Sequence, residues 1–263
     1  MKEARILLRR EGAVAVMTIN RPGAGNTIDR PLTAELEVIA SAIAQDSAVR
    51  CVVLTGAGKL FCGGGDIAAM AAAADCSAYL QGLADALHRS VEVLSSMSKP
   101  LLVLVNGPAA GAGLSLAILG DLVLASRSAH FTAAYGSVGL TPDGGMSWLL
   151  PRLVGLRRAQ EMILGNRRVS AEEGAAIGLV TRVVDDHDLL AEGMALARQL
   201  AEGPTLALGM ARSLLREGQG VSLNHQLARE ARTIASAAAL PDAREGVAAF
   251  LDRRPAQFSG ETR

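Results

Sequence analysis

The sequence predicts an α/β protein in which helices pack on a sheet, followed by a region made of helices alone. Apolar runs of strand length alternate with segments of helical period up to about residue 185. From residue 189 onward the pattern is helical throughout. Half of the 263 residues are apolar, which is enough to bury a large core. We therefore expect a core domain over residues 1–188 and a helical region over residues 189–263.

The first elements are a predicted hairpin and a helix. Residues 6–10 and 13–19 are rich in apolar and β-branched side chains, and Glu11-Gly12 between them is a typical hairpin turn. Residues 32–44 then carry apolar side chains at helical spacing, and Asp29 is a suitable start signal for that helix.

Two predicted strands, both apolar enough to be buried, each lead into a glycine-rich loop. Residues 51–55 precede the loop at residues 59–66, which contains three consecutive glycines. Residues 101–105 form a continuous apolar run that opens into a second glycine-rich loop at residues 106–113. Because both loops follow buried strands, we expect them to lie at the same edge of the sheet.

The remaining elements follow from the same periodicities. The other helices of the core are predicted over residues 67–74, 79–94, 114–119, 146–153, 159–164 and 171–177, and the other strands over residues 121–125 and 179–184. The C-terminal region is predicted as four helices over residues 189–201, 205–216, 223–238 and 242–253. Such a region buries its apolar stripes against the body or against another subunit, so we expect an oligomer.

Composition excludes several classes of protein. The 26 basic and 26 acidic residues balance, so the chain has no overall charge that would attract nucleic acid. No apolar run reaches the length of about 20 residues that a membrane span needs, and no secretory signal is evident, so we expect a cytoplasmic protein. The three cysteines and four histidines have no metal-ligand spacing, so we expect neither a disulfide scaffold nor a metal site.

Bare backbone N–H groups from two glycine loops can stabilise negative charge on a carbonyl oxygen, the arrangement called an oxyanion hole. The competing interpretation is a phosphate-binding loop, because Gly63–Ala68 fits a loose dinucleotide-binding pattern. That pattern should begin directly at the end of a strand, whereas residues 57–62 intervene here. The spacing therefore favours the oxyanion hole.

The motifs in these loops resemble those of a known family. Asn20-Arg-Pro22, Gly58–Ile67, Lys99-Pro100 with Val105–Gly113, and the closing segment Glu245–Pro255 resemble the crotonase (enoyl-CoA hydratase/isomerase) superfamily in order and spacing. The resemblance implies a crotonase-like spiral of ββα units with a C-terminal helical trimerisation region, and acyl-CoA thioesters as substrates. It also implies a homotrimer or a dimer of trimers, and no cofactor beyond the coenzyme A of the substrate.

Catalytic roles follow from the same resemblance. The two oxyanion-hole amides fall on Gly63 and Gly111. The positions of the two glutamates that hydratases of this family use hold Ser115 and Tyr135, which are not carboxylates. Asp143 remains as the acid/base, although an aspartate before two glycines is also a common turn or helix cap. This segment resembles the branch that contains 1,2-epoxyphenylacetyl-CoA isomerases and 3-enoyl to 2-enoyl isomerases.

Contacts to the substrate are also implied by the resemblance. The backbone at Ala24, Asn26, Gly65, Asp66 and Ile67 is expected to face the adenine and pantetheine of coenzyme A, and Phe250 and Arg253 are expected to approach the adenine and phosphate. Ser115 and Tyr135 are expected to offer a hydroxyl group or to shape the acyl pocket. The family frequently has a lysine before the position of Ala24, and this chain has Gly23 there.

We therefore expect an acyl-CoA isomerase, because one carboxylate can remove a proton at one carbon and return it two carbons away, whereas water addition ordinarily calls for a second group. The sequence leaves open a hydratase that works through Asp143 alone and a catalytically silent acyl-CoA-binding protein.

Overall fold

The structure, a computed structural model, describes residues 3–261. Its main sheet has the strand order β1-β2-β3-β4-β6-β9. The strands are β1 (Ile6–Glu11), β2 (Val14–Ile19), β3 (Cys51–Gly56), β4 (Leu101–Val105), β6 (Leu122–Ser126) and β9 (Arg182–Val184). Only β1 and β2 pair antiparallel, and all other neighbours are parallel. The predicted strands are confirmed, with β9 shorter than expected.

A second sheet was not predicted. It has the order β5-β7-β8, and its strands are β5 (Ala109–Ala110), β7 (His130–Thr132) and β8 (Val169–Ser170). Strands of two or three residues are too short to show an alternation of apolar and polar side chains. This sheet matters for function because β5 is part of the second glycine loop.

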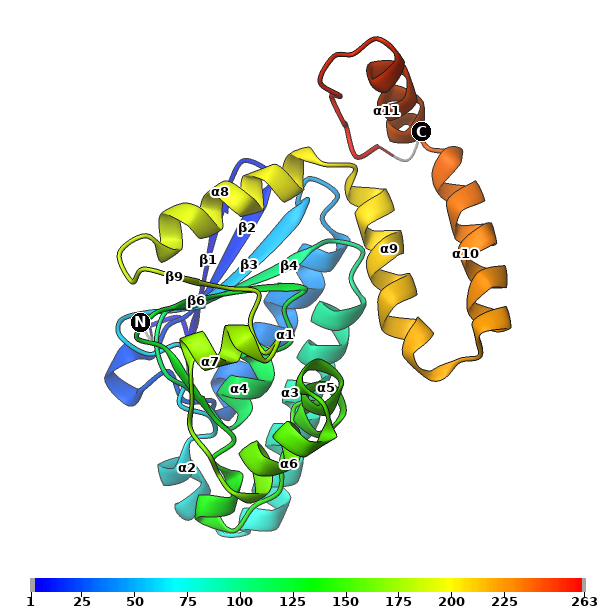
Figure 1. Ribbon diagram of the computed structural model, residues 1–263. Helices are drawn as coiled ribbons and strands as arrows, with labels where there is room; N and C mark the ends of the chain where they lie inside the picture. The colour runs from blue at the N-terminus through cyan, green and yellow to red at the C-terminus, as the bar shows by residue number, and fades with distance from the viewer. Residues whose placement is uncertain (1–2, 262–263) are drawn as a thin grey trace.

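The α-helices before residue 189 lie on one side of the main sheet, some packed on it and others farther from it (Figure 1). These helices are α1 (Arg30–Gln45), α2 (Ile67–Ala71), α3 (Cys76–Ser96), α4 (Ala112–Ala117), α5 (Met146–Val154), α6 (Leu156–Leu164) and α7 (Ala171–Ala176). The start of α1 is fixed as predicted, because the Asp29 side chain accepts a hydrogen bond from the Leu32 amide at 2.9 Å.

The opposite face of the sheet is covered by α8 (Leu189–Glu202), the first helix of the predicted tail (Figure 1). Leu189, Met194 and Ala197 are buried there against alternate residues of β3 and β4, such as Val53 and Leu104. The helical region therefore begins at residue 189 as expected, but its first helix is part of the packed body. The packed body therefore extends at least to Ala201.

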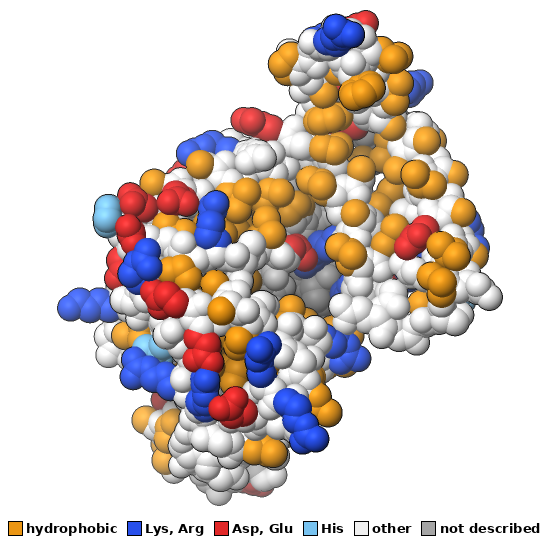
Figure 2. Space-filling model, in the orientation of Figure 1, with side chains coloured by type: hydrophobic (Ala, Val, Ile, Leu, Met, Phe, Trp, Pro, Cys, Tyr) orange, Lys and Arg blue, Asp and Glu red, His pale blue; other side chains and the backbone are white. Residues whose placement is uncertain are grey.

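The rest of the C-terminal region projects from the body (Figure 1). It consists of α9 (Thr205–Glu217), α10 (Leu223–Ala238) and α11 (Pro241–Leu251). Arg212 anchors α9 to the end of α3 by donating to the carbonyl oxygens of Met97 and Leu94 at 2.6 and 2.7 Å. No residue of α10 is buried in the single chain, and apolar side chains lie exposed along the tail (Figure 2). Over the described residues, no helix is both long and apolar enough to cross a membrane.

Candidate active site

The two glycine loops meet at the carboxyl end of the sheet, as the sequence predicts. Cys62 forms a parallel bridge with Ala109, and the Ala110 amide donates to the Cys62 carbonyl oxygen at 3.0 Å. Gly64 packs on the same segment so closely that a Cβ atom there would lie 2.8 Å from the Ala110 carbonyl oxygen. The adjacent parallel strands β3 and β4 bring the loops together because both strands end at this edge.

The amides predicted for the oxyanion hole are already hydrogen-bonded. The Gly63 N–H donates to the Gly25 carbonyl oxygen at 2.9 Å, and the Gly111 N–H donates to the Thr132 carbonyl oxygen at 3.1 Å. Both residues line the main cavity, but their N–H groups are not free to bind a ligand. The prediction of Gly63 and Gly111 as donors is therefore wrong.

Two neighbouring residues have N–H groups without such partners. Within residues 3–261, neither the Gly65 nor the Ala112 N–H group donates a hydrogen bond to another backbone group. Ala112 is the first residue of α4, where an N–H group has no partner inside the helix. Both residues line the same cavity as Gly63 and Gly111. Placing the helix start at residue 112 instead of 114 from sequence would have identified one of them.

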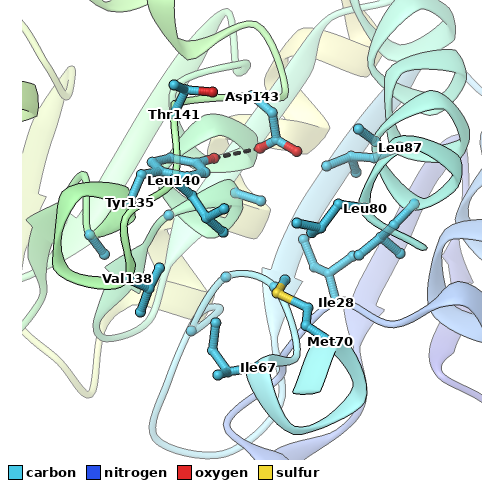
Figure 3. A pocket seen from close by; sticks show the side chains of 18 of the residues that line it. Ile28, Ile67, Met70, Leu80, Leu87, Tyr135, Val138, Leu140, Thr141 and Asp143 are labelled. Carbon is cyan, nitrogen blue, oxygen red and sulfur yellow. Dashed lines mark hydrogen bonds between the residues drawn. The ribbon is translucent and has the colours of Figure 1, made fainter. Parts of the chain in front are cut away.

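The cavity has a volume of about 490 Å³ and is mostly apolar. Its apolar lining comes from Ile28 before α1, from α2 and α3, and from the segment after β7, and includes Met70, Leu80, Leu83, Leu87, Val138 and Leu140. Figure 3 shows these side chains converging on one space, with Ile67 and Met70 on the side opposite Asp143. Such a cavity suits an apolar acyl group.

Asp143 is the one carboxylate among the described residues that line this cavity. The Tyr135 hydroxyl donates to Oδ1 of Asp143 at 2.5 Å (Figure 3). Burial, together with the nearby negative charge of Asp143, raises the pKa of Tyr135 above its ordinary range. Ser115 is buried behind the loop, and its Oγ donates to the carbonyl oxygen of Asp143 at 2.9 Å. The two residues at the glutamate positions therefore both contact Asp143.

The side chain of Asn26, a residue whose backbone is predicted to contact coenzyme A, holds the local fold. This side chain is fully buried and accepts from the Arg21 amide at 2.8 Å. The same side chain donates to the carbonyl oxygens of Ala57 and Leu60 at 2.8 and 2.7 Å. Ala24 is exposed beside it, and its carbonyl oxygen accepts from the Thr27 hydroxyl at 2.9 Å. Neither residue lines the main cavity.

Asp66 also has a structural role in the single chain. Its side chain caps α2 by accepting from the Ala69 amide at 3.1 Å, and it pairs with Arg21 at 3.0 Å. Although burial acts in the opposite direction, the Ala69 amide and the Arg21 guanidinium hold the pKa of Asp66 below its ordinary value. Ile67, which follows it, is half exposed and lines the cavity.

Phe250 and Arg253 are not brought to the site within one chain. Phe250 is 83% exposed on α11, at the far end of the tail from α2 and α3 (Figure 1). Arg253 follows that helix and is exposed as well. Among residues 3–261, no cluster of three or more histidine, cysteine, aspartate or glutamate side chains could hold a metal ion.

Comparisons with known proteins identify the family to which this sequence belongs. The model of the enoyl-CoA hydratase/isomerase family matches residues 9–261. The 1,2-epoxyphenylacetyl-CoA isomerase of Escherichia coli (strain K12) is 38% identical over 97% of this chain and 98% of its own. The 2,3-dehydroadipyl-CoA hydratase of the same organism is 34% identical over 98% of this chain and 99% of its own.

Solved structures of similar sequence have the same fold. The crystal structure of a putative enoyl-CoA hydratase/isomerase from Mycobacterium abscessus superposes with a TM-score of 0.94 at 34% identity, covering 97% of this chain and 100% of the other. An enoyl-CoA hydratase from Polaromonas sp. JS666 superposes with a TM-score of 0.92 at 33% identity, covering 96% and 99%. The architecture is thus the crotonase-like spiral that the sequence motifs predict. The chain belongs to the enoyl-CoA hydratase/isomerase family.

Proposed function

We propose that the protein is an acyl-CoA isomerase with Asp143 as its acid/base. The observation that carries this proposal is that Asp143 is the single carboxylate among the described residues that line a largely apolar cavity. The wall of the same cavity contains the free amides of Gly65 and Ala112. The acyl chain would occupy the apolar part of the cavity, and the thioester carbonyl would lie at the glycine loops.

In this proposal the Gly65 and Ala112 N–H groups donate to the thioester oxygen, and together they form the oxyanion hole. Their hydrogen bonds strengthen as the substrate loses a proton at carbon and negative charge moves to that oxygen. With a 3-enoyl thioester, Asp143 accepts the proton and returns it two carbons away, so the double bond shifts while Asp143 ends in its starting state. No water molecule is consumed, which is why a single carboxylate is sufficient.

Two relatives bear on the substrate. The 38% identical Escherichia coli protein is a 1,2-epoxyphenylacetyl-CoA isomerase, which favours a ring epoxide or a 3-enoyl thioester as substrate. The 34% identical protein from the same organism is a hydratase, so a hydratase that works through Asp143 alone is the second candidate. The absence of a second carboxylate among the described cavity residues favours the isomerase.

The test is an assay of the purified protein against epoxide, 3-enoyl and 2-enoyl thioesters of coenzyme A, with Asp143→Asn beside it. We expect isomerisation of the first or second class, and loss of nearly all turnover in Asp143→Asn with acyl-CoA binding retained. Substantial isomerase activity in Asp143→Asn, or hydration as the main reaction, would overturn the proposal. Binding without turnover of any class would indicate a silent acyl-CoA-binding protein.

We also propose that the projecting tail joins copies of the chain into a homotrimer or a dimer of trimers. Its support is the row of exposed apolar side chains on α10 and α11, including Leu223, Ile234, Val247, Phe250 and Leu251. The predicted approach of Phe250 and Arg253 to coenzyme A then requires the tail of a second copy. Light scattering on the purified protein tests this assembly, and a monomer at micromolar concentration would contradict it.

A further inference from the structure

Three side chains from three different elements converge on Asp143. Tyr135 comes from the short 3-10 helix after β7 (Tyr135–Val138), Ser115 from α4, and His88 from α3. Tyr135 contacts the carboxylate, whereas Ser115 and His88 contact the backbone next to it. Asp143 is therefore held at its side chain and at its main chain separately.

The positions of the protons in this cluster follow from chemistry. An ionised carboxylate only accepts hydrogen bonds, so the one hydroxyl proton of Tyr135 lies on the bond to Oδ1 of Asp143. Its length of 2.5 Å is typical of an O–H group that donates to a charged oxygen. Burial raises the pKa of Tyr135, so the hydroxyl keeps this proton wherever the enzyme operates.

Ser115 has its own single proton, and it is used for the carbonyl oxygen of Asp143. The contact of 3.5 Å between the hydroxyls of Ser115 and Tyr135 therefore carries no proton in this arrangement. Both hydroxyl groups donate to residue 143. Oδ1 is thus occupied, and Oδ2 is the carboxylate oxygen left for a substrate.

The peptide unit after Asp143 is held at both ends. Its carbonyl oxygen accepts from Ser115 at 2.9 Å, and its N–H group, on Gly144, donates to Nε2 of His88 at 3.0 Å. His88 accepts through Nε2, so the proton of its neutral ring lies on Nδ1. Gly144 has a φ of +60°, and a Cβ atom there would lie 2.8 Å from Cβ of Ser115. The orientation of this peptide plane is therefore fixed by packing as well.

We propose that Tyr135 is a positioning residue that binds Oδ1 of Asp143 and so makes Oδ2 the oxygen that exchanges a proton with the substrate, while Ser115 and His88 fix the peptide plane that carries it. This inference rests on the proposed function of Asp143. In the reaction, a substrate C–H bond breaks and an O–H bond forms at Oδ2, and the electron pair of the C–H bond enters the enolate. The Tyr135 proton stays on its own oxygen throughout.

The first test is Tyr135→Phe, which removes the hydroxyl and keeps the ring. We expect kcat to fall by about 10- to 100-fold, as for the loss of a hydrogen bond to a charged group, with KM and the melting temperature nearly unchanged.

The second test compares His88→Gln, which can keep an acceptor for the Gly144 amide, with His88→Leu, which cannot. We expect His88→Gln to retain most of the activity and His88→Leu to lose kcat with little change in acyl-CoA affinity. Equal activity of the two variants would show that the contact to Gly144 has no role in positioning.

Asp143→Asn separates this inference from the proposed function. If Asp143→Asn is inactive while Tyr135→Phe has the kcat of the wild type, the positioning role is wrong and the role of Asp143 remains. If Asp143→Asn is active, the proposed function itself fails. If Tyr135→Phe is too unstable to assay, the activities of His88→Gln and His88→Leu decide whether the peptide plane is held as proposed.

Discussion

The backbone of Gly64 lies directly against the carbonyl oxygen of Ala110. A Cβ atom at Gly64 would come within 2.8 Å of that oxygen, and Gly64 has a φ of +94°, which favours glycine. This contact joins the loop that carries the Gly65 amide to the loop that carries the Ala112 amide. The spacing of the two proposed donors therefore depends on Gly64 having no side chain.

We predict that Gly64→Ala lowers kcat by at least about 100-fold, the effect typical of losing one donor of an oxyanion hole. Gly139→Ala is the matched control, because Gly139 has a similar φ of +70° but no atom within 4 Å of the position that a Cβ would take. Steady-state kinetics and melting temperatures of both variants check the prediction. Equal losses of kcat in the two variants would mean that backbone strain, and not loop spacing, is responsible.

We expect the Asn26 side chain to stabilise the folded protein. We predict that Asn26→Ala lowers the free energy of unfolding by about 3 kcal/mol or more, because it leaves buried backbone groups unpaired and places alanine at a positive φ of 54°. Asn224→Ala, on the exposed side of α10, should have little effect. Urea denaturation measures both. A normal unfolding midpoint with weakened coenzyme A binding would instead support a direct contact.

The position of α8 on the sheet gives a third prediction. Met194 is 4% exposed in the core beneath this helix, whereas Leu190 on the same helix is 52% exposed. We predict that Met194→Ala destabilises the protein by about 2–5 kcal/mol, as for other large-to-small changes in a core. Leu190→Ala should change stability much less. If both variants have the melting temperature of the wild type, α8 does not belong to the packed body.

Two buried thiols should make the free energy of unfolding decrease at alkaline pH. Burial raises the pKa of Cys62 from 9.0 to about 12. Burial, with the negative charge of Asp121, does the same for Cys51. A raised folded pKa means that the unfolded thiol ionises first, so stability is full below about pH 9 and is lost as pH rises toward 12.

We therefore expect the free energy of unfolding to fall by up to about 1.4 kcal/mol per pH unit for each buried thiol over this range. Cys51→Ala and Cys62→Ala should each make the fall less steep between pH 9 and 10.5. Cys76→Ala should not change the slope, because Cys76 is exposed. Urea titrations at several pH values provide the measurement, and identical slopes in all variants would contradict the assignment.

The sequence predicted most of the fold because the features concerned are local. The continuous apolar run at residues 101–105 is a strand with the predicted bounds, and Asp29 caps α1 as expected. The family follows from the same kind of information, since its motifs are contiguous segments. Asp143 can be selected as the candidate acid/base because its segment resembles one branch of the family, and the structure places it in the cavity.

The tertiary structure decided which groups are free to act. Whether the Gly63 amide can bind a ligand depends on the Gly25 carbonyl oxygen, and for Gly111 it depends on Thr132 in a strand too short to predict. The meeting of Tyr135, Ser115 and His88 at Asp143 has the same origin. The sequence by itself determined most of the elements, the family and the candidate carboxylate. Only the folded chain determined which donors have partners, because partners distant in sequence meet through packing.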